Sequence, residues 1–211
     1  MPRIHGAAAS PFVRKVRVAM AEKNLPYELV PVFPFGVSAE FLKMSPLGKI
    51  PVYEEDGFTL PDSSCILAYL ERAHPQPALL PADPKLAARA LFLEEYADTR
   101  LVETLGPVFF ERVVKARFLK QEPDAKRIEE TLAKTPAVLD WVESQLGDGP
   151  VVGGRFSIAD IALASPFVNW MYGGERVDAA RWPKLASFIE RTWSRPSFKA
   201  LIEEEKAQMG V

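Results

Sequence analysis

The residues best suited to chemistry are hydroxyl and carboxylate side chains at the starts of predicted helices. Ser10 stands directly before Pro11, and a serine followed by proline is a preferred way to begin a helix. A hydroxyl at such a position, together with the first backbone amides, can stabilise a negative charge on a ligand. No histidine is placed to activate Ser10 as a nucleophile, so its predicted role is stabilisation rather than attack. The alternative is that Ser10 only caps the helix.

A second group of this kind is residues 62–64, Asp-Ser-Ser, which follows Pro61. These residues are candidate N-caps for a helix whose apolar side chains recur at helical spacing. Capping alone would account for Asp62 and Ser63.

The elements that must position these side chains form an α/β pattern in the first third of the chain. Residues 56–57, Asp-Gly, favour a tight hairpin because both central positions of that turn need positive φ. The opening strand, helix and strand predict a parallel pair with a right-handed crossover. The predicted strands are residues 3–6, 27–32, 50–53 and 58–60. The predicted helices are residues 11–24, residues 38–43, and a helix capped within residues 62–64 whose apolar positions run from Ile66 to Ala73.

A proline-rich stretch separates this region from the rest. We predict a first domain over residues 1–74, a linker over 75–84 and a helical second domain over 85–211. Ser157 and Asp160 have the spacing of a capping box, which is a structural signal. The predicted helices of the second domain are residues 85–120, broken or bent near Gly106-Pro107, residues 126–146 with a kink or early break at Pro136, a helix from Ser157, and residues 182–193 and 196–208.

Composition excludes several classes of protein. Hydrophobic residues make up 48% and charged residues 26% of the chain, as expected for a globular protein with a core. The net charge of −2 argues against nonspecific nucleic-acid or membrane binding, and no apolar run approaches the ~20 residues of a membrane helix. One cysteine and two histidines make a disulfide scaffold or a zinc site implausible, so we expect no metal and a cytoplasmic location without a targeting peptide. Cys65 is expected to be a small, inert core residue.

Three motifs together resemble the soluble glutathione S-transferase family. They are SPFVRKVRVAMAEKNLPYELV at residues 10–30, SPLGKIPVYEEDGFTLPDSSCILAYL at residues 45–70 and GRFSIADIALA at residues 154–164. The second is similar to the family's cis-proline and glutathione-binding block, and the third to the capping box of its second domain. The resemblance implies a thioredoxin-like N-terminal domain of order βαβαββα followed by an all-α helical bundle. It also implies a homodimer.

The resemblance assigns chemistry to the residues singled out above. Conjugation of glutathione, the cosubstrate, to an electrophile needs a thiolate, and Ser10 would stabilise it, as in serine-type members of the family. Relatives with cysteine here favour thiol-disulfide exchange. The expected glutathione contacts are Ser10, Phe12, Lys49, Ile50, a cis Pro51, Asp62 and Ser63. Ile50 would pair with the cysteinyl backbone, Ser63 would bind the γ-glutamyl carboxylate and Asp62 its ammonium group, with Lys49 a further charge contact.

The electrophile, a small hydrophobic molecule, is expected between the domains against Phe12, Phe109, Phe110 and Arg112, with Phe118 nearby. Core packing is the alternative for these aromatic residues. Two departures from the family pattern stand out: residues 7–9 are alanines where many bacterial relatives have a second serine, and residues 36–37 leave the glycyl carboxylate without a partner. Two other functions stay open, a noncatalytic binding protein of the same fold and an isomerase, dehalogenase or peroxidase that uses the same thiolate.

Overall fold

The structure is a computed structural model that describes residues 1–210. Its internal contacts divide into two compact units, residues 1–80 with 197–210, and residues 81–196. The last helix, which we expected in a second domain over 85–211, therefore belongs by its contacts to the first unit; Val211 lies outside the described residues. None of the described helices is long and apolar enough to span a bilayer.

The first unit contains a four-stranded mixed sheet of order β2-β1-β3-β4. The pairing of β1 with β2 is parallel, and the pairings of β1 with β3 and of β3 with β4 are antiparallel. Asp56 and Gly57 both have positive φ, 48° and 83°, so the predicted hairpin turn is confirmed. The strands are β1 (Arg3–His5), β2 (Glu28–Val30), β3 (Val52–Glu55) and β4 (Phe58–Pro61).

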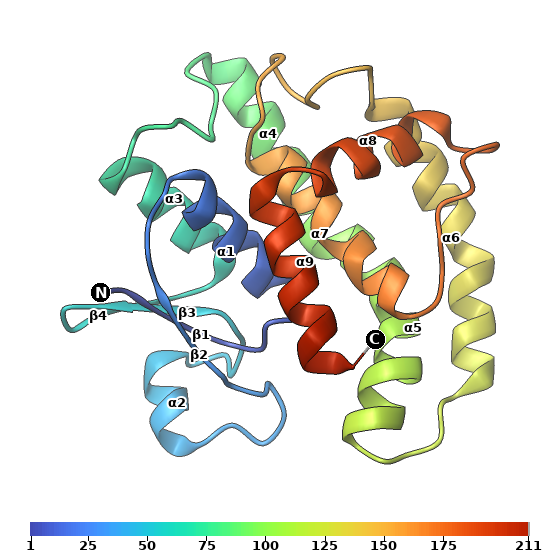
Figure 1. The fold of residues 1–211 in the computed structure, drawn as a ribbon, viewed down its shortest axis with the longest axis horizontal. Coiled ribbons are helices and arrows are strands. Elements are labelled where there is room, and N and C mark those ends of the chain that lie inside the picture. The colour runs from blue at the N-terminus through green and yellow to red at the C-terminus, as the bar shows by residue number, and fades with distance from the viewer. Residues whose placement is uncertain (211) are drawn as a thin grey trace. The chain divides into compact units, whose positions relative to one another are not determined.

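Helices of the first unit cover this sheet as the α/β pattern predicts. Figure 1 shows α1 and α3 together on one side of the strands and α2 on the other. Val16 and Met20 of α1 and Ile66 and Leu70 of α3 are fully buried in a core with Ile4 of the sheet. The thioredoxin-like order is thereby confirmed. The helices are α1 (Pro11–Glu22), α2 (Ala39–Met44), α3 (Ser63–Ala73) and α9 (Pro196–Met209).

The second unit is entirely helical in the residues described, as predicted. Its central helix, α7, is buried on nearly all sides from Ile158 to Trp170, and its start has the predicted capping box of Ser157 and Asp160. The Asp160 carboxylate also accepts a hydrogen bond from the Val151 amide at 2.9 Å, so it ties the preceding loop to the helix. The other helices are α4 (Pro84–Tyr96), α5 (Val102–Phe109), α6 (Ala125–Gln145), α7 (Ile158–Tyr172) and α8 (Pro183–Trp193).

Three prolines lie inside helices that continue past them. Pro107 lies within α5, Pro136 within α6 and Pro166 within α7, so none of them ends its helix. The irregular parts of residues 84–118 are instead two π-helical segments, Ala97–Leu101 and Phe110–Phe118, on either side of α5. Each proline removes a backbone donor, but burial of the flanking apolar residues holds the helices together.

A buried carboxylate fixes the start of α6. Glu111 accepts hydrogen bonds from the Asp124 amide at 2.9 Å and from Arg127 at 3.0 Å, and Lys115 lies 2.9 Å away. Its side chain is 1% exposed. Burial raises the pKa of Glu111, but the Asp124 amide and the charges of Lys115 and Arg127 outweigh it and hold this pKa below its ordinary value.

We expect this carboxylate to make stability depend on pH. Its pKa is lower folded than unfolded, so its contribution is present above the unfolded pKa and is lost as pH falls toward the folded one. Glu111→Gln should lower the free energy of unfolding at pH 7 by about 1–3 kcal/mol and reduce the stability lost between pH 7 and 4, measured by urea unfolding. The control is Glu130→Gln, whose exposed pair with Lys126 is 3.9 Å long. An unchanged pH slope in the Glu111 variant would contradict the expectation.

Candidate functional site

The register of the sheet brings the predicted site residues to one end. His5 lies opposite Val30 on one side and Val52 on the other, and Val52 lies opposite Pro61. These residues therefore form one row across the four strands, about 4.8 Å apart from strand to strand. The chain segments that carry Ser10, residues 50–51 and residues 62–63 adjoin the β1, β3 and β4 members of this row.

Ser10 is the N-cap of α1. Its Oγ accepts a hydrogen bond from the Val13 amide at 3.4 Å, a long bond, and its own amide donates to the Ala7 carbonyl at 3.0 Å. Ser10 therefore does cap the helix, as the alternative interpretation predicts. The Ser10 hydroxyl hydrogen, however, has no acceptor among residues 1–210. It remains available to a ligand beside the positive end of a helix.

At Gly6 the backbone after β1 packs closely against α1 and against the loop before β3. A Cβ at this position would lie 2.5 Å from a Val13 methyl and 3.5 Å from the Ile50 Cβ. Only glycine allows β1, α1 and the Ile50 loop to approach so closely. The Ile50–Pro51 peptide bond is cis, as predicted. Ser45, a residue that the sequence did not single out, fixes this loop, because its buried hydroxyl bonds the Lys49 carbonyl at 2.7 Å and amide at 3.2 Å.

The backbone of Ile50 lies outside the β-ladder. Pairing of β3 begins at Val52, and the N–H and C=O groups of Ile50 have no hydrogen-bond partner in the part of the chain that the structure describes. Ile50 itself is 92% buried by area, with 8% exposed. An extended peptide could therefore pair with this backbone without displacing a strand. Lys49 is exposed beside it.

Asp62 and Ser63 have separate roles at the start of α3. Asp62 is the N-cap, and its Oδ1 accepts from the amides of Ser64 and Cys65, both at 3.0 Å. Its backbone has φ 79° and ψ 125°, a strained conformation for a residue with a side chain. Its Oδ2 and the Ser63 hydroxyl have no hydrogen-bond partner among the residues described. Capping thus uses one oxygen of Asp62 and none of Ser63.

A buried cation adds positive potential here. Lys15 of α1 is 1% exposed, and its Nζ donates to Ser64 Oγ at 3.3 Å. Lys15 was not singled out from the sequence. It is one and two positions from Val16 and Val13, not three or four, so helical spacing gives no sign that it is buried. An ammonium beside the α3 N-terminus favours an anionic ligand group.

The residues predicted for an electrophile pocket lie in both units. Phe12 is half-buried in the first turn of α1 in the first unit. In the second unit, Arg112 donates to the Gly173 carbonyl and to Glu175, both at 2.7 Å, and Phe109 packs on Tyr172 with ring centroids 6.4 Å apart. Phe110 lies under the Arg127 guanidinium at 5.6 Å. The pocket stays a prediction.

The expectation for Cys65 was wrong. Its side chain is exposed. The buried positions of α3 are Ser63, Ile66, Leu67 and Leu70, which lie three or four positions apart on one face of the helix, and residue 65 falls outside that stripe.

The whole chain is similar in sequence and structure to proteins of one known family. Residues 4–78 match the description "Glutathione S-transferase, N-terminal domain", and residues 125–191 match "Glutathione S-transferase, C-terminal domain". The chain is 30% identical to YibF of Escherichia coli K12, an uncharacterised GST-like protein, over 97% of this chain and 100% of that one. It is 32% identical to a glutathione S-transferase of Hyoscyamus muticus, over 95% and 97% of the two chains. A Methylobacterium radiotolerans glutathione S-transferase, solved with glutathione sulfonate, is 34% identical with a TM-score of 0.78, covering 95% of this chain and 94% of that one.

Proposed function

Because the chain belongs to the glutathione S-transferase family, we propose that it conjugates glutathione to small hydrophobic electrophiles and that Ser10 stabilises the reacting thiolate. In this reaction the glutathione sulfur forms a bond to an electrophilic carbon, the leaving group departs with its electron pair, and the thiol proton goes to solvent. The observation that carries the proposal is the set of unpartnered hydrogen-bonding groups at one end of the sheet: the Ser10 and Ser63 hydroxyls and the Ile50 backbone.

Each of these groups matches one part of glutathione. The Ile50 backbone suits the cysteinyl residue, which would add to the sheet like a short strand. The Ser63 hydroxyl, at the N-terminus of α3 and next to the Lys15–Ser64 contact, suits the γ-glutamyl carboxylate. The free Oδ2 of Asp62 suits the γ-glutamyl ammonium group. Lys49, cis Pro51 and Phe12 border the cysteinyl part.

In this arrangement we propose that Ser10 stabilises the glutathione sulfur as a thiolate. A free thiol has a pKa of about 8.5 and is only a few per cent ionised at neutral pH. Lowering that pKa by about two units requires about 2.7 kcal/mol of preferential stabilisation of the thiolate. One hydrogen bond to a charged sulfur and a helix N-terminus together supply energy of this order.

The remaining parts of the proposal rest on family membership. We place the electrophile against Phe12, Phe109, Phe110 and Arg112, the protein in the cytoplasm and its active form as a homodimer. No metal or nucleic acid takes part in the proposed reaction.

Titration with glutathione, together with an assay on a reactive aryl halide, tests the function. We expect saturable binding and conjugation by the unmodified protein. Binding without conjugation of any electrophile would favour the noncatalytic alternative, and peroxide reduction without conjugation would favour a peroxidase. Absence of glutathione binding would overturn the proposal.

Ser63→Ala tests the binding half of the site. Loss of one hydrogen bond to a carboxylate should weaken glutathione binding roughly tenfold, measured by calorimetry. Because the Ser63 hydroxyl has no partner among the residues described, the melting temperature should stay nearly unchanged. Unchanged affinity would remove Ser63 from the site, and a large fall in melting temperature would assign it a structural role instead.

A further inference from the structure

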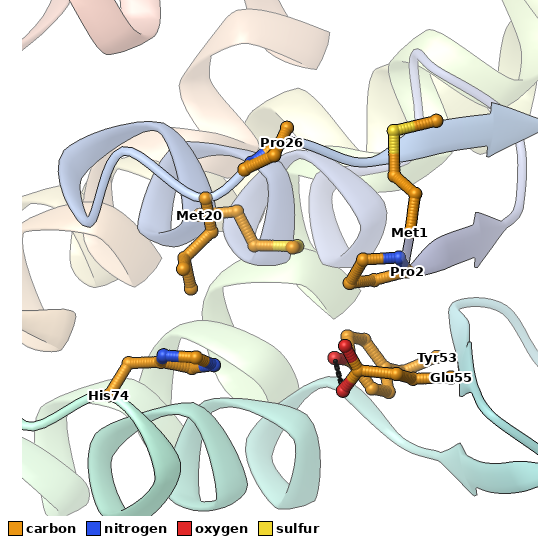
Figure 2. Close-up of a pocket in the computed structure, with 8 residues that line it drawn as sticks. Met1, Pro2, Met20, Pro26, Tyr53, Glu55 and His74 are labelled. Atoms are coloured by element: carbon orange, nitrogen blue, oxygen red, sulfur yellow. Dashed lines mark hydrogen bonds between the residues drawn. The ribbon is translucent and has the colours of Figure 1, made fainter.

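A pocket lies at the other end of the same sheet, away from the Ser10 site. It has a volume of about 320 Å³ and is bounded by residues that precede β1, by the end of α1, by β3 and by the end of α3. This volume is near the lower limit of small-molecule sites, about 300–1,000 Å³. Figure 2 shows the Glu55 carboxylate and the His74 ring on facing sides of the opening, with Met20 and Pro26 above them.

Glu55 is held as an acceptor by two tyrosines. One of its oxygens, Oε2, accepts from the Tyr53 hydroxyl at 2.6 Å and from the Tyr69 hydroxyl at 3.3 Å. Tyr53 is completely buried. Its burial is the main cause of a raised pKa of its phenol, and its hydrogen bond to Glu55 raises that pKa further. Tyr53 therefore remains a hydrogen donor, and the carboxylate orientation is fixed. The second oxygen, Oε1, has no partner within residues 1–210.

The preceding residue provides a contrast within the same strand. Glu54 points to the opposite face of β3, where His5 lies 2.7 Å and Arg3 3.8 Å from its carboxylate. Among the residues described, Glu55 forms no ion pair. A half-buried carboxylate with one free oxygen beside apolar walls gains most from a ligand that brings its own positive charge.

We propose that this pocket binds a small organic ammonium ion with an apolar body. The ammonium group donates to Glu55 Oε1, and the neutral form of His74 can accept a further hydrogen bond. The apolar body packs on Met1, Met20, Leu25 and Pro26. The proposal is independent of the proposed transferase function, because the pocket shares no residue with the Ser10 site.

Benzylammonium and its neutral analogue benzyl alcohol are suitable probes for the full-length protein. Methionine methyl groups labelled with ¹³C report the position of binding by NMR. The chain has five methionines, and Met1 and Met20 line the pocket whereas Met44, Met171 and Met209 do not. We expect benzylammonium to shift the Met1 and Met20 signals saturably and benzyl alcohol to bind at least roughly tenfold more weakly.

Glu55→Gln and the matched Glu54→Gln separate the pocket charge from general surface charge. Glu55→Gln should weaken benzylammonium binding roughly tenfold and leave benzyl alcohol unaffected, while Glu54→Gln should change neither. The proposal would be overturned if the unmodified protein bound both probes with equal affinity, or if Glu55→Gln bound benzylammonium as tightly as the unmodified protein does. It would also be overturned if only the signals of the other methionines shifted, or if no binding saturated in the millimolar range. The comparison of the two probes needs no variant, so it stands even if Glu55→Gln fails to fold.

Discussion

Ser10→Ala is expected to lower kcat/KM for conjugation roughly 10²-fold at pH 6, because the thiolate fraction falls 100-fold when the sulfur pKa returns by two units to about 8.5. The loss should shrink as pH rises above that value, where glutathione ionises without help. The pH dependence of kcat/KM should therefore move upward by about two units, and ultraviolet absorbance of the bound thiolate should follow the same curve. Glutathione affinity should change less than the rate, since the Ser63 and Ile50 contacts remain.

The capping role of Ser10 needs its own control. The bond from the Val13 amide is 3.4 Å long, so Ser10→Ala should cost about 1 kcal/mol of stability or less. Ser10→Asp provides a cap of equal quality, but an ionised carboxylate has no hydrogen to donate to sulfur. It should restore stability without restoring activity, whereas Ser10→Thr, which keeps the hydroxyl, should restore part of both. Full activity in Ser10→Ala would refute the catalytic assignment.

The parts of the fold that the sequence predicts are those encoded by short, local signals. The Asp56-Gly57 turn, the Ser10-Pro11 helix start and the Ser157–Asp160 capping box each need only a few neighbouring residues, and the structure has all three. Asp62 and Ser63 lie at the same end of the sheet as Ser10 because of the sheet register, and the hairpin turn fixes the β3–β4 part of that register.

Features that depend on contacts far apart in the chain were not predictable in this way. The sequence gives no local sign that α9 contacts α1, because Arg14 and Glu205 are 191 positions apart. Lys15 and Ser64 are likewise separated by 49 residues. The Glu55 pocket could not be predicted from the sequence either. Whether a carboxylate on a strand forms an ion pair depends on which residues the tertiary structure packs against that face of the strand.

The contact between α1 and α9 is expected to be a major source of stability in the first unit. Arg14 and Glu205 have side chains with 0% exposure, and their contacts include Nε–Oε1 at 2.8 Å, Nε–Oε2 at 3.1 Å and Nη2–Oε2 at 2.5 Å. Removing one member of such a pair leaves a buried charge without its counterion. Glu205→Ala should therefore lower the free energy of unfolding by about 3–5 kcal/mol, measured by urea unfolding monitored by circular dichroism.

A neighbouring pair on the same two helices is the matched control. Arg17 lies 2.6 Å from Glu204, but the Glu204 side chain is 39% exposed and Arg17 also donates to the Tyr27 hydroxyl at 2.7 Å. Glu204→Ala should cost about 1–3 kcal/mol, less than Glu205→Ala, because the Arg17 side chain is buried but keeps its bond to the Tyr27 hydroxyl and the Glu204 side chain is already partly in water. The double variant Arg14→Met with Glu205→Leu should recover most of the stability lost in Glu205→Ala, since it removes both charges and keeps the buried volume. A double variant as unstable as Glu205→Ala would mean that α9 is held by geometry specific to the ion pair rather than by burial.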